Sequence, residues 1–133
     1  MTYFDTSALV GALLQTHPRH KECLALLEQT RERITCAHTL AETFSTLTAS
    51  YKVPNEVAAE LTLGLRDFVS VGVLSLRDYE TAITEARQRG IMGGGIYDSL
   101  HATYARRHSA RRIVTRNPGD FKHVAPELEI IVP

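Results

Sequence analysis

Short apolar segments that alternate with longer helix-like segments limit how this chain can fold more than any other feature of its sequence. The apolar segments span residues 2–4, 34–37, 72–76, 112–115 and 128–132, and helical patterns lie at 7–15, 19–31, 39–51, 55–69, 78–89 and 97–108. Continuous apolar strands separated by helices are typical of a parallel sheet that is covered on both faces. We therefore predict an α/β fold, an α/β/α sandwich around a mostly parallel sheet of five strands.

The length and composition predict one globular domain spanning residues 1–133. The chain has 133 residues, of which 44% are hydrophobic, so it can bury a substantial core. It has no apolar run close to the roughly 20 residues that span a bilayer, and its N-terminus lacks the pattern of a secretion signal. We expect a cytoplasmic protein that does not bind membranes. Cys23 and Cys36 have no metal or redox spacing and are predicted core residues.

The formal net charge is zero, which argues against a protein that coats nucleic acid or membranes indiscriminately. The charge is nevertheless uneven, because residues 101–123 contain six Lys or Arg against the single acid Asp120. This excess of five positive charges has two interpretations. It is either a solvated helix end, where cations suit the helix dipole, or a rim that binds phosphates.

Acidic or amide side chains lie close to the ends of several predicted strands. Asp5 directly follows the first strand, Glu42 lies early in the helix after the second, and Asp98 falls in the first turn of a helix after a glycine loop. Asn117 and Asp120 follow the fourth strand in a predicted Pro-Gly turn. Each has an ordinary explanation by itself, as a cap, an exposed helical acid or a turn residue. Together they gather at one place, since ligands bind beyond the carboxyl ends of parallel strands.

A cluster of carboxylates implies a bound cation. Like charges within a few Å raise one another's pKa and destabilise the fold unless a cation neutralises them. Because every candidate ligand is a hard oxygen, Mg²⁺ or Mn²⁺ is favoured over zinc. Such ions activate water and stabilise an in-line displacement at phosphorus. The residues therefore predict a metal-dependent phosphodiesterase or nuclease.

Four motifs occur in an order that resembles a known family. FDTSALV, AETF, GGGIYDSLHA and VTRNPGDF together make the chain similar to PIN-domain ribonucleases, and most to the VapC toxins of type II toxin-antitoxin pairs. The resemblance implies Mg²⁺-dependent RNA cleavage, a homodimer and a cognate antitoxin. It makes Asp5, Glu42 and Asp98 the catalytic, metal-binding acids. It also implies that nearby hydroxyls assist the cofactor site, namely Thr6 or Ser7 and Thr115.

The fourth acidic position departs from the family pattern. Many relatives carry an Asp two residues after the threonine that ends the fourth strand, and here that residue is Asn117. An amide offers its carbonyl oxygen but no charge. Either Asp120 therefore substitutes as the fourth catalytic acid and metal ligand, or Asn117 binds a second metal weakly. The choice between them stays open.

Other features have weaker interpretations. His38 and His101 can each share a helix face with a neighbouring acid, and are predicted to be bystanders or hydrogen-bond donors to it. The apolar stripe over residues 40–68 is predicted to be mostly core, part of it a groove for an antitoxin helix. Ser7 replaces the second Asp that a haloacid dehalogenase-type phosphatase needs, and residues 76–78 do not supply the phosphorylatable Asp of a receiver domain. A catalytically silent PIN scaffold that binds RNA or protein is the remaining alternative.

Overall fold

A five-stranded sheet organises the chain, of which the computed structural model describes all residues, 1–133. The strands are β1 (Thr2–Phe4), β2 (Arg33–Cys36), β3 (Ser70–Gly72), β4 (Arg112–Val114) and β5 (Glu129–Ile131). They are ordered β3-β2-β1-β4-β5, and every neighbouring pair is parallel. The predicted α/β fold with a parallel five-stranded sheet is confirmed.

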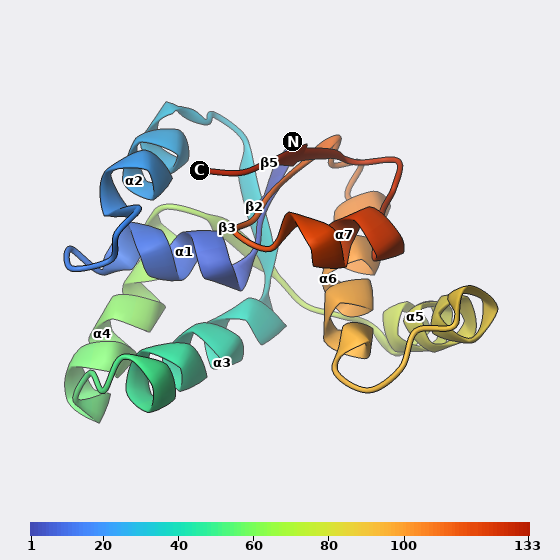
Figure 1. The fold of residues 1–133 in the computed structure, drawn as a ribbon, viewed down its shortest axis with the longest axis horizontal. Coiled ribbons are helices and arrows are strands. Elements are labelled where there is room, and N and C mark those ends of the chain that lie inside the picture. The colour runs from blue at the N-terminus through green and yellow to red at the C-terminus, as the bar shows by residue number, and fades with distance from the viewer.

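Helices connect the strands and cover the sheet (Figure 1). They are α1 (Thr6–Leu13), α2 (His20–Gln29), α3 (Ala37–Ser45), α4 (Asn55–Gly64), α5 (Leu76–Arg89), α6 (Gly95–Arg107) and α7 (Pro118–Val124). A π-helical turn, η1 (Thr46–Ser50), extends α3, and a short 3₁₀ turn, η2 (Leu65–Asp67), extends α4. The chain has no helix with the length and apolar character that a bilayer crossing requires.

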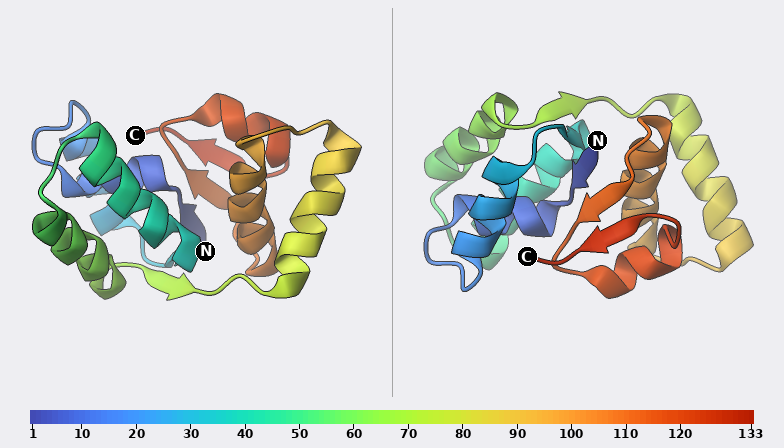
Figure 2. Two further views of the ribbon diagram at one scale, coloured as in Figure 1. Left: turned by 90° about the horizontal axis from the view of Figure 1, so that it is seen from below. Right: turned by 90° about the horizontal axis from the view of Figure 1, so that it is seen from above.

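Side-chain alternation along β1 divides the core between the two faces of the sheet. Tyr3 packs on one face in a cluster with residues of α6 and α7, including Phe121. Phe4 points to the other face and packs with residues of α1 and α2, including Leu9 and Leu27. This alternation follows from the two-residue period of a strand. Figure 2 shows the outer pairs, α3 beside α4 and α5 beside α6.

Two predicted segments were wrong. The third strand is Ser70–Gly72 instead of 72–76, because Ser75 begins α5 with a capping box in which Asp78 is the reciprocal partner. The predicted Pro-Gly turn after β4 is the helix α7, with proline in its first turn. Phe121 and Val124 lie three residues apart and are 1% and 4% exposed. Their burial against the sheet stabilises a helix where the local residues favour a turn.

The strand order places a topological switch point beside β1. The chain runs from β1 outward to β2 and β3 on one side, then returns to β4 and β5 on the other side of β1. The carboxyl ends of β1 and β4 are therefore adjacent, and the loops that leave them diverge. Asp5 follows β1 and Thr115 follows β4. In open parallel sheets this crevice is where ligands bind.

Candidate active site

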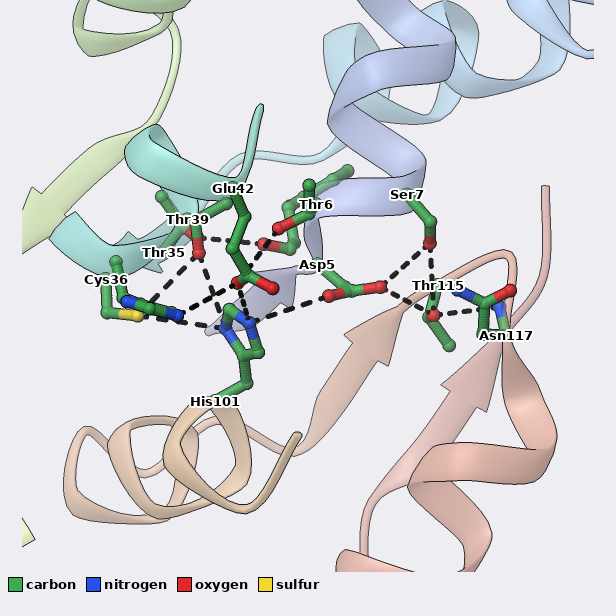
Figure 3. A network of polar contacts seen from close by, with 12 residues as sticks. Asp5, Thr6, Ser7, Thr35, Cys36, Thr39, Glu42, His101, Thr115 and Asn117 are labelled. Atoms are coloured by element: carbon green, nitrogen blue, oxygen red, sulfur yellow. Dashed lines mark hydrogen bonds and ion pairs between the residues drawn. The ribbon is translucent and has the colours of Figure 1, made fainter. Parts of the chain in front are cut away.

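Asp5 is fixed at the end of β1 by hydroxyl groups from two segments (Figure 3). Its Oδ2 accepts hydrogen bonds from Ser7 Oγ at 2.8 Å and from Thr115 Oγ1 at 2.9 Å. Each hydroxyl in turn accepts a backbone N–H from the loop after β4, Ser7 from Arg116 at 2.8 Å and Thr115 from Asn117 at 3.0 Å. Asp5 as a whole is only 5% exposed. The hydroxyls predicted beside the acid are thus present, and they restrain its orientation.

Glu42 reaches the same place from α3. Its Oε1 accepts hydrogen bonds from His101 Nε2 and from Thr6 Oγ1, the latter at 3.3 Å, and lies 3.7 Å from His38 Nε2. Burial raises the pKa of Glu42, but the hydrogen bond and charge of His101 outweigh burial, so the pKa lies below its usual value. Glu42 is therefore a carboxylate at neutral pH, with Oε2 free of hydrogen bonds.

His101 is the centre of a buried polar network beneath the acids. It is 1% exposed, and its Nε2 lies 4.0 Å from Asp5 Oδ1 in addition to contacting Glu42. Its Nδ1 is hydrogen-bonded to the Tyr3 hydroxyl, which also contacts Thr39 Oγ1 at 3.2 Å. Burial alone would lower the pKa of His101, but the polar groups around the ring outweigh it and raise the pKa well above its usual value. His101 thus places positive charge behind two acids.

Asp98 lies in the first turn of α6, facing the other acids. Burial, together with the negative charges of Asp120 and Asp5, raises its pKa to about 6. Asp98 makes no hydrogen bond or ion pair that would hold its carboxylate, unlike Asp5 and Glu42. Asp98, whose pKa is raised by neighbouring charges, is thus the least restrained of the three acids.

The three acids line one pocket of about 580 Å³ at the carboxyl edge of the sheet. Besides Asp5, Glu42 and Asp98, its wall contains Thr6, Ser7, Arg116 and Asn117, and on the side of the α1–α2 loop it contains His17, Arg19 and Tyr51. Its volume falls within the range of about 300 to 1,000 Å³ that ligand pockets occupy. The structure therefore brings together the predicted acids and adds a group of cationic and aromatic side chains.

The two candidates for the fourth ligand occupy different places. Asn117 lines the pocket directly from the start of α7. Asp120 lies one turn further along α7 and does not line the pocket, but its charge contributes to the raised pKa of Asp98. Asn117 therefore has the access that a metal ligand needs, and Asp120 has the negative charge.

The donor set fits a hard divalent cation. No three His, Cys, Asp or Glu side chains converge closely enough to form a ready-made metal cage. The carboxylates nevertheless share one pocket, and the charges of Asp120 and Asp5 add to burial in raising the pKa of Asp98. Their oxygens and the amide oxygen of Asn117 are the donors that Mg²⁺ and Mn²⁺ prefer. A cation here would relieve the repulsion between the acids.

The arginines of residues 101–123 do not all fit one interpretation, a solvated surface or a rim that binds phosphates. Three of them pair with carboxylates within 3.0 Å: Arg106 with Glu85, Arg107 with Asp78, and Arg112 with Glu129. These side chains stabilise the surface and do not form a broad basic face. Arg116 is different, since it has no carboxylate partner from a side chain and lines the acid pocket. It alone fits the interpretation as a phosphate-binding rim.

Sequence reasoning underestimated His101 and missed His17, Tyr51 and Tyr3 as site residues. The spacing of Asp98 and His101 put both on one helix face, but it did not reveal that His101 would be buried beneath the acids. The sequence indicated only an apolar strand residue at Tyr3, since the groups that its hydroxyl contacts come from other segments. No local signal pointed to His17 or Tyr51, because a loop and the π-helical turn bring them to the pocket.

The fold and site together define a class of protein. It is a small parallel α/β protein with an acid-lined pocket at the switch point of its sheet, where β1 and β4 diverge. Within that class the sequence identifies the relatives more narrowly. The sequence profile described as PIN domain matches residues 2–126, nearly the whole chain. The chain belongs to the PIN domain family.

Comparisons with individual proteins agree. Ribonuclease VapC27 of Mycobacterium tuberculosis (strain ATCC 25618 / H37Rv) is 35% identical over 117 residues, covering 85% of this chain and 82% of that protein. The crystal structure of M. tuberculosis VapC20, described as a sarcin-ricin loop cleaving toxin, has a TM-score of 0.73 at 18% identity, covering 85% and 87% of the two chains. VapBC2 of Rickettsia felis, bound to a DNA fragment from its promoter, has a TM-score of 0.72 at 23% identity, covering 100% and 99%. These two structures support the fold.

Proposed function

We propose that this protein is a metal-dependent endoribonuclease and the toxin of a type II toxin-antitoxin pair. One observation carries the proposal: Asp5, Glu42 and Asp98 line a single pocket at the switch point of the sheet. Membership of the PIN domain family and the 35% identity to Ribonuclease VapC27 support the same activity. Asp5, Glu42 and Asp98 are the proposed catalytic acids, and Asn117 or Asp120 completes the set.

These residues would hold Mg²⁺ or Mn²⁺ through their oxygens. A divalent cation supplies, when bound, a water of lowered pKa and charge stabilisation for a phosphate in the transition state. The chain's own residues prepare the site for this chemistry. Ser7 and Thr115 fix Asp5, and His101 fixes Glu42, so that two carboxylates are oriented before any ligand arrives. Asp98 is freer and adjusts to the ligand.

The charged side chains of the site also favour one orientation of a bound phosphodiester. The imidazole of His101 lies behind Asp5 and Glu42 and offsets part of their charge from the protein side. The open side of the pocket then keeps the charge of Asp98, which attracts a cation from solvent. Arg116 at the rim offers a guanidinium to a phosphate oxygen. A cationic rim beside an acidic centre suits a phosphodiester whose negative oxygens approach from the rim.

The toxin role brings a partner. VapBC-1 from nontypeable Haemophilus influenzae has a TM-score of 0.70 at 18% identity over 99% of this chain and 98% of that one, and it, like VapBC2, is a VapBC pair. We propose that this chain binds a cognate antitoxin protein. Exposed apolar side chains on α3 and α4 are the proposed contact surface, with Phe44 at 37%, Val57 at 44% and Leu63 at 49% exposure. The homodimer and the cytoplasmic location remain predictions.

The catalytically silent scaffold remains a second candidate because of one residue. Asn117 stands where many relatives carry an acid, and this removes a negative charge from the wall of the pocket. A PIN protein with a weakened metal site could still bind RNA through Arg116. The two candidates differ in whether RNA is cut.

The test is incubation of the purified chain with tRNA and ribosomal RNA, with Mg²⁺ or with EDTA. Discrete fragments should appear with Mg²⁺ only, and Asp5→Asn and Asp98→Asn should each abolish them while circular dichroism shows an intact fold. Wild-type cleavage by either variant would show that the proposed site is wrong. Binding without fragments under every metal condition would favour the silent scaffold.

The toxin role has a separate test in cells. Expression of the chain alone should arrest bacterial growth, and co-expression of the product of the neighbouring reading frame should restore it. Asp98→Asn expressed to the same level should be harmless. Normal growth with an active, well-expressed nuclease would contradict the toxin role while leaving the ribonuclease proposal intact.

A further inference from the structure

The half of the pocket opposite the acids has the chemistry of a nucleotide subsite. We propose that His17, Tyr51 and Arg116 bind one unpaired nucleotide of the RNA, next to the phosphate that the acids receive. The proposal rests on the ribonuclease function given above and assigns the residues that contact the nucleotide beside the cleaved phosphate. It rests on three observations: a pair of rings, an arginine without a side-chain carboxylate partner, and the backbone that places the tyrosine.

The two rings form an open aromatic wall. The rings of His17 and Tyr51 lie with their centroids 6.1 Å apart at an interplanar angle of 46°. His17 Nδ1 accepts a hydrogen bond from the backbone N–H of Arg19 at 3.0 Å, which fixes the ring in the α1–α2 loop. Tyr51 is 43% exposed, so one of its faces is available to a ligand. Rings of this kind stack on nucleic-acid bases irrespective of base identity.

An unusual backbone delivers Tyr51 to this wall. The π-helical turn at the end of α3 closes with a hydrogen bond from Tyr51 N to Thr46 O of 3.3 Å, five residues back. Lys52 follows with φ at 56°, a left-handed conformation that costs a non-glycine residue about 1 kcal/mol or more. A regular α-helix would carry Tyr51 on to a different face. Such π-helical insertions are concentrated at functional sites, and this one ends at the pocket.

Arg116 supplies the phosphate contact between the aromatic wall and the acids. Its backbone N–H is tied to Ser7 Oγ, beside Asp5, and its guanidinium donates one hydrogen bond to the carbonyl of Pro133. A guanidinium has five N–H donors, so most of them are free for phosphate oxygens. The side chain also lies close enough to His17 for its charge to help lower the pKa of that ring. A neutral ring beside an arginine suits a stacked base with an adjacent phosphate.

The geometry selects unpaired nucleotides. A base in an A-form duplex is stacked and paired, so its faces are not available to Tyr51, whereas a base in a loop can be splayed out onto an aromatic side chain. The pocket of about 580 Å³ has room for a small ligand and none for a duplex. His17, Tyr51 and Arg116 therefore suit an unpaired nucleotide beside the cleaved phosphate.

The experiment measures binding of a fluorescein-labelled single-stranded hexauridine RNA by anisotropy, with EDTA present to prevent cleavage. Tyr51→Ala should weaken binding about 5- to 10-fold, the loss expected for one stacked base. Tyr51→Phe should bind within about two-fold of the wild type, because it keeps the ring. Tyr79→Ala is the matched control, since Tyr79 on α5 is 40% exposed and lies outside the pocket. It should not change affinity.

Two further probes separate stacking from a structural effect. A hexamer that is abasic at every position should bind the wild type and Tyr51→Ala equally, whereas Arg116→Ala should weaken both oligonucleotides. Arg116→Ala should also reduce the slope of log affinity against log salt by about 0.7. Tyr51→Ala should leave affinity for a blunt RNA duplex unchanged. Unchanged hexauridine binding by Tyr51→Ala, an equal loss with the abasic hexamer, or no binding by the wild type would overturn the subsite.

Failure of the subsite and of the ribonuclease function are distinguishable. Wild-type cleavage with Mg²⁺ together with unchanged binding by Tyr51→Ala would reject the subsite alone. Tyr51-dependent binding without cleavage by the wild type under any metal condition would reject the nuclease and keep the subsite as an RNA-binding site.

Discussion

Replacing Asp98 by Asn should stabilise the metal-free protein while abolishing its activity. The ionised form of Asp98 destabilises the folded state, since burial and the charges of Asp120 and Asp5 raise its pKa from 3.8 to about 6. At about 1.4 kcal/mol per pKa unit, this corresponds to about 3 kcal/mol of destabilisation at neutral pH. Because the residue is only partly buried, solvent screening reduces the figure. We expect Asp98→Asn to raise the free energy of unfolding by about 1–2 kcal/mol.

The destabilisation by Asp98 should depend on pH in a defined direction. A carboxyl group with a raised pKa in the folded state binds its proton more tightly there than in the unfolded chain, so protonation favours folding. The destabilisation is complete above about pH 6, decreases as the pH falls through that value, and is absent below 3.8. The advantage of Asp98→Asn over the wild type should therefore fall by about half between pH 7.5 and pH 5.0.

Urea denaturation in EDTA at the two pH values measures this difference, and thermal melts at pH 7.5 should show a gain of about 3 to 6 °C. Asp67→Asn, which removes an exposed carboxylate of η2 outside the pocket, is the control and should change stability by less than about 0.5 kcal/mol. Mg²⁺ should then stabilise the wild type more than Asp98→Asn. No gain at pH 7.5, or an equal gain at pH 5.0, would refute the electrostatic reasoning.

Two further predictions concern packing and the fourth ligand. Gly72→Ala should destabilise the fold by about 2 kcal/mol or more, because the new Cβ would lie 2.0 Å from the Tyr104 hydroxyl. Gly64→Ala in α4 is the control, because nothing lies within 4 Å of the new Cβ. It should be neutral or stabilising in the same urea titration. If Asp120 completes the metal site, Asp120→Ala should raise the Mg²⁺ concentration for half-maximal cleavage several-fold and Asn117→Ala should raise it less. The reverse order would make Asn117 the ligand.

The sheet and the acids were predictable from sequence because each has a local signature. Short apolar runs between helical patterns give the parallel sheet, and an acid after a strand is carried to its carboxyl edge by topology alone. The same reasoning failed for α7, where Pro118, Gly119 and Asp120 favour a turn but burial of Phe121 and Val124 decides for a helix.

Parts of the site had no local signature. His101 looks like any histidine on a helix, and its role follows from contacts with Tyr3 and Glu42, which lie 98 and 59 positions away in the chain. Tyr51 reaches the pocket only because α3 ends in a π-helical turn, and the sequence predicts an uninterrupted helix there. Local patterns thus specify which groups are available, while long-range packing specifies which of them meet.

The hydrogen bond between Asp5 and Thr115 joins residues that are 110 positions apart in the chain. During synthesis on a ribosome, Asp5 and Ser7 emerge early, yet Thr115 and the neighbouring His101 of α6 are made among the last. β1 is a central strand and lacks one neighbour until β4 has left the exit tunnel. A nascent chain without β4 therefore lacks the Thr115 hydroxyl that holds Asp5 in place. The site is thus completed only near the end of synthesis.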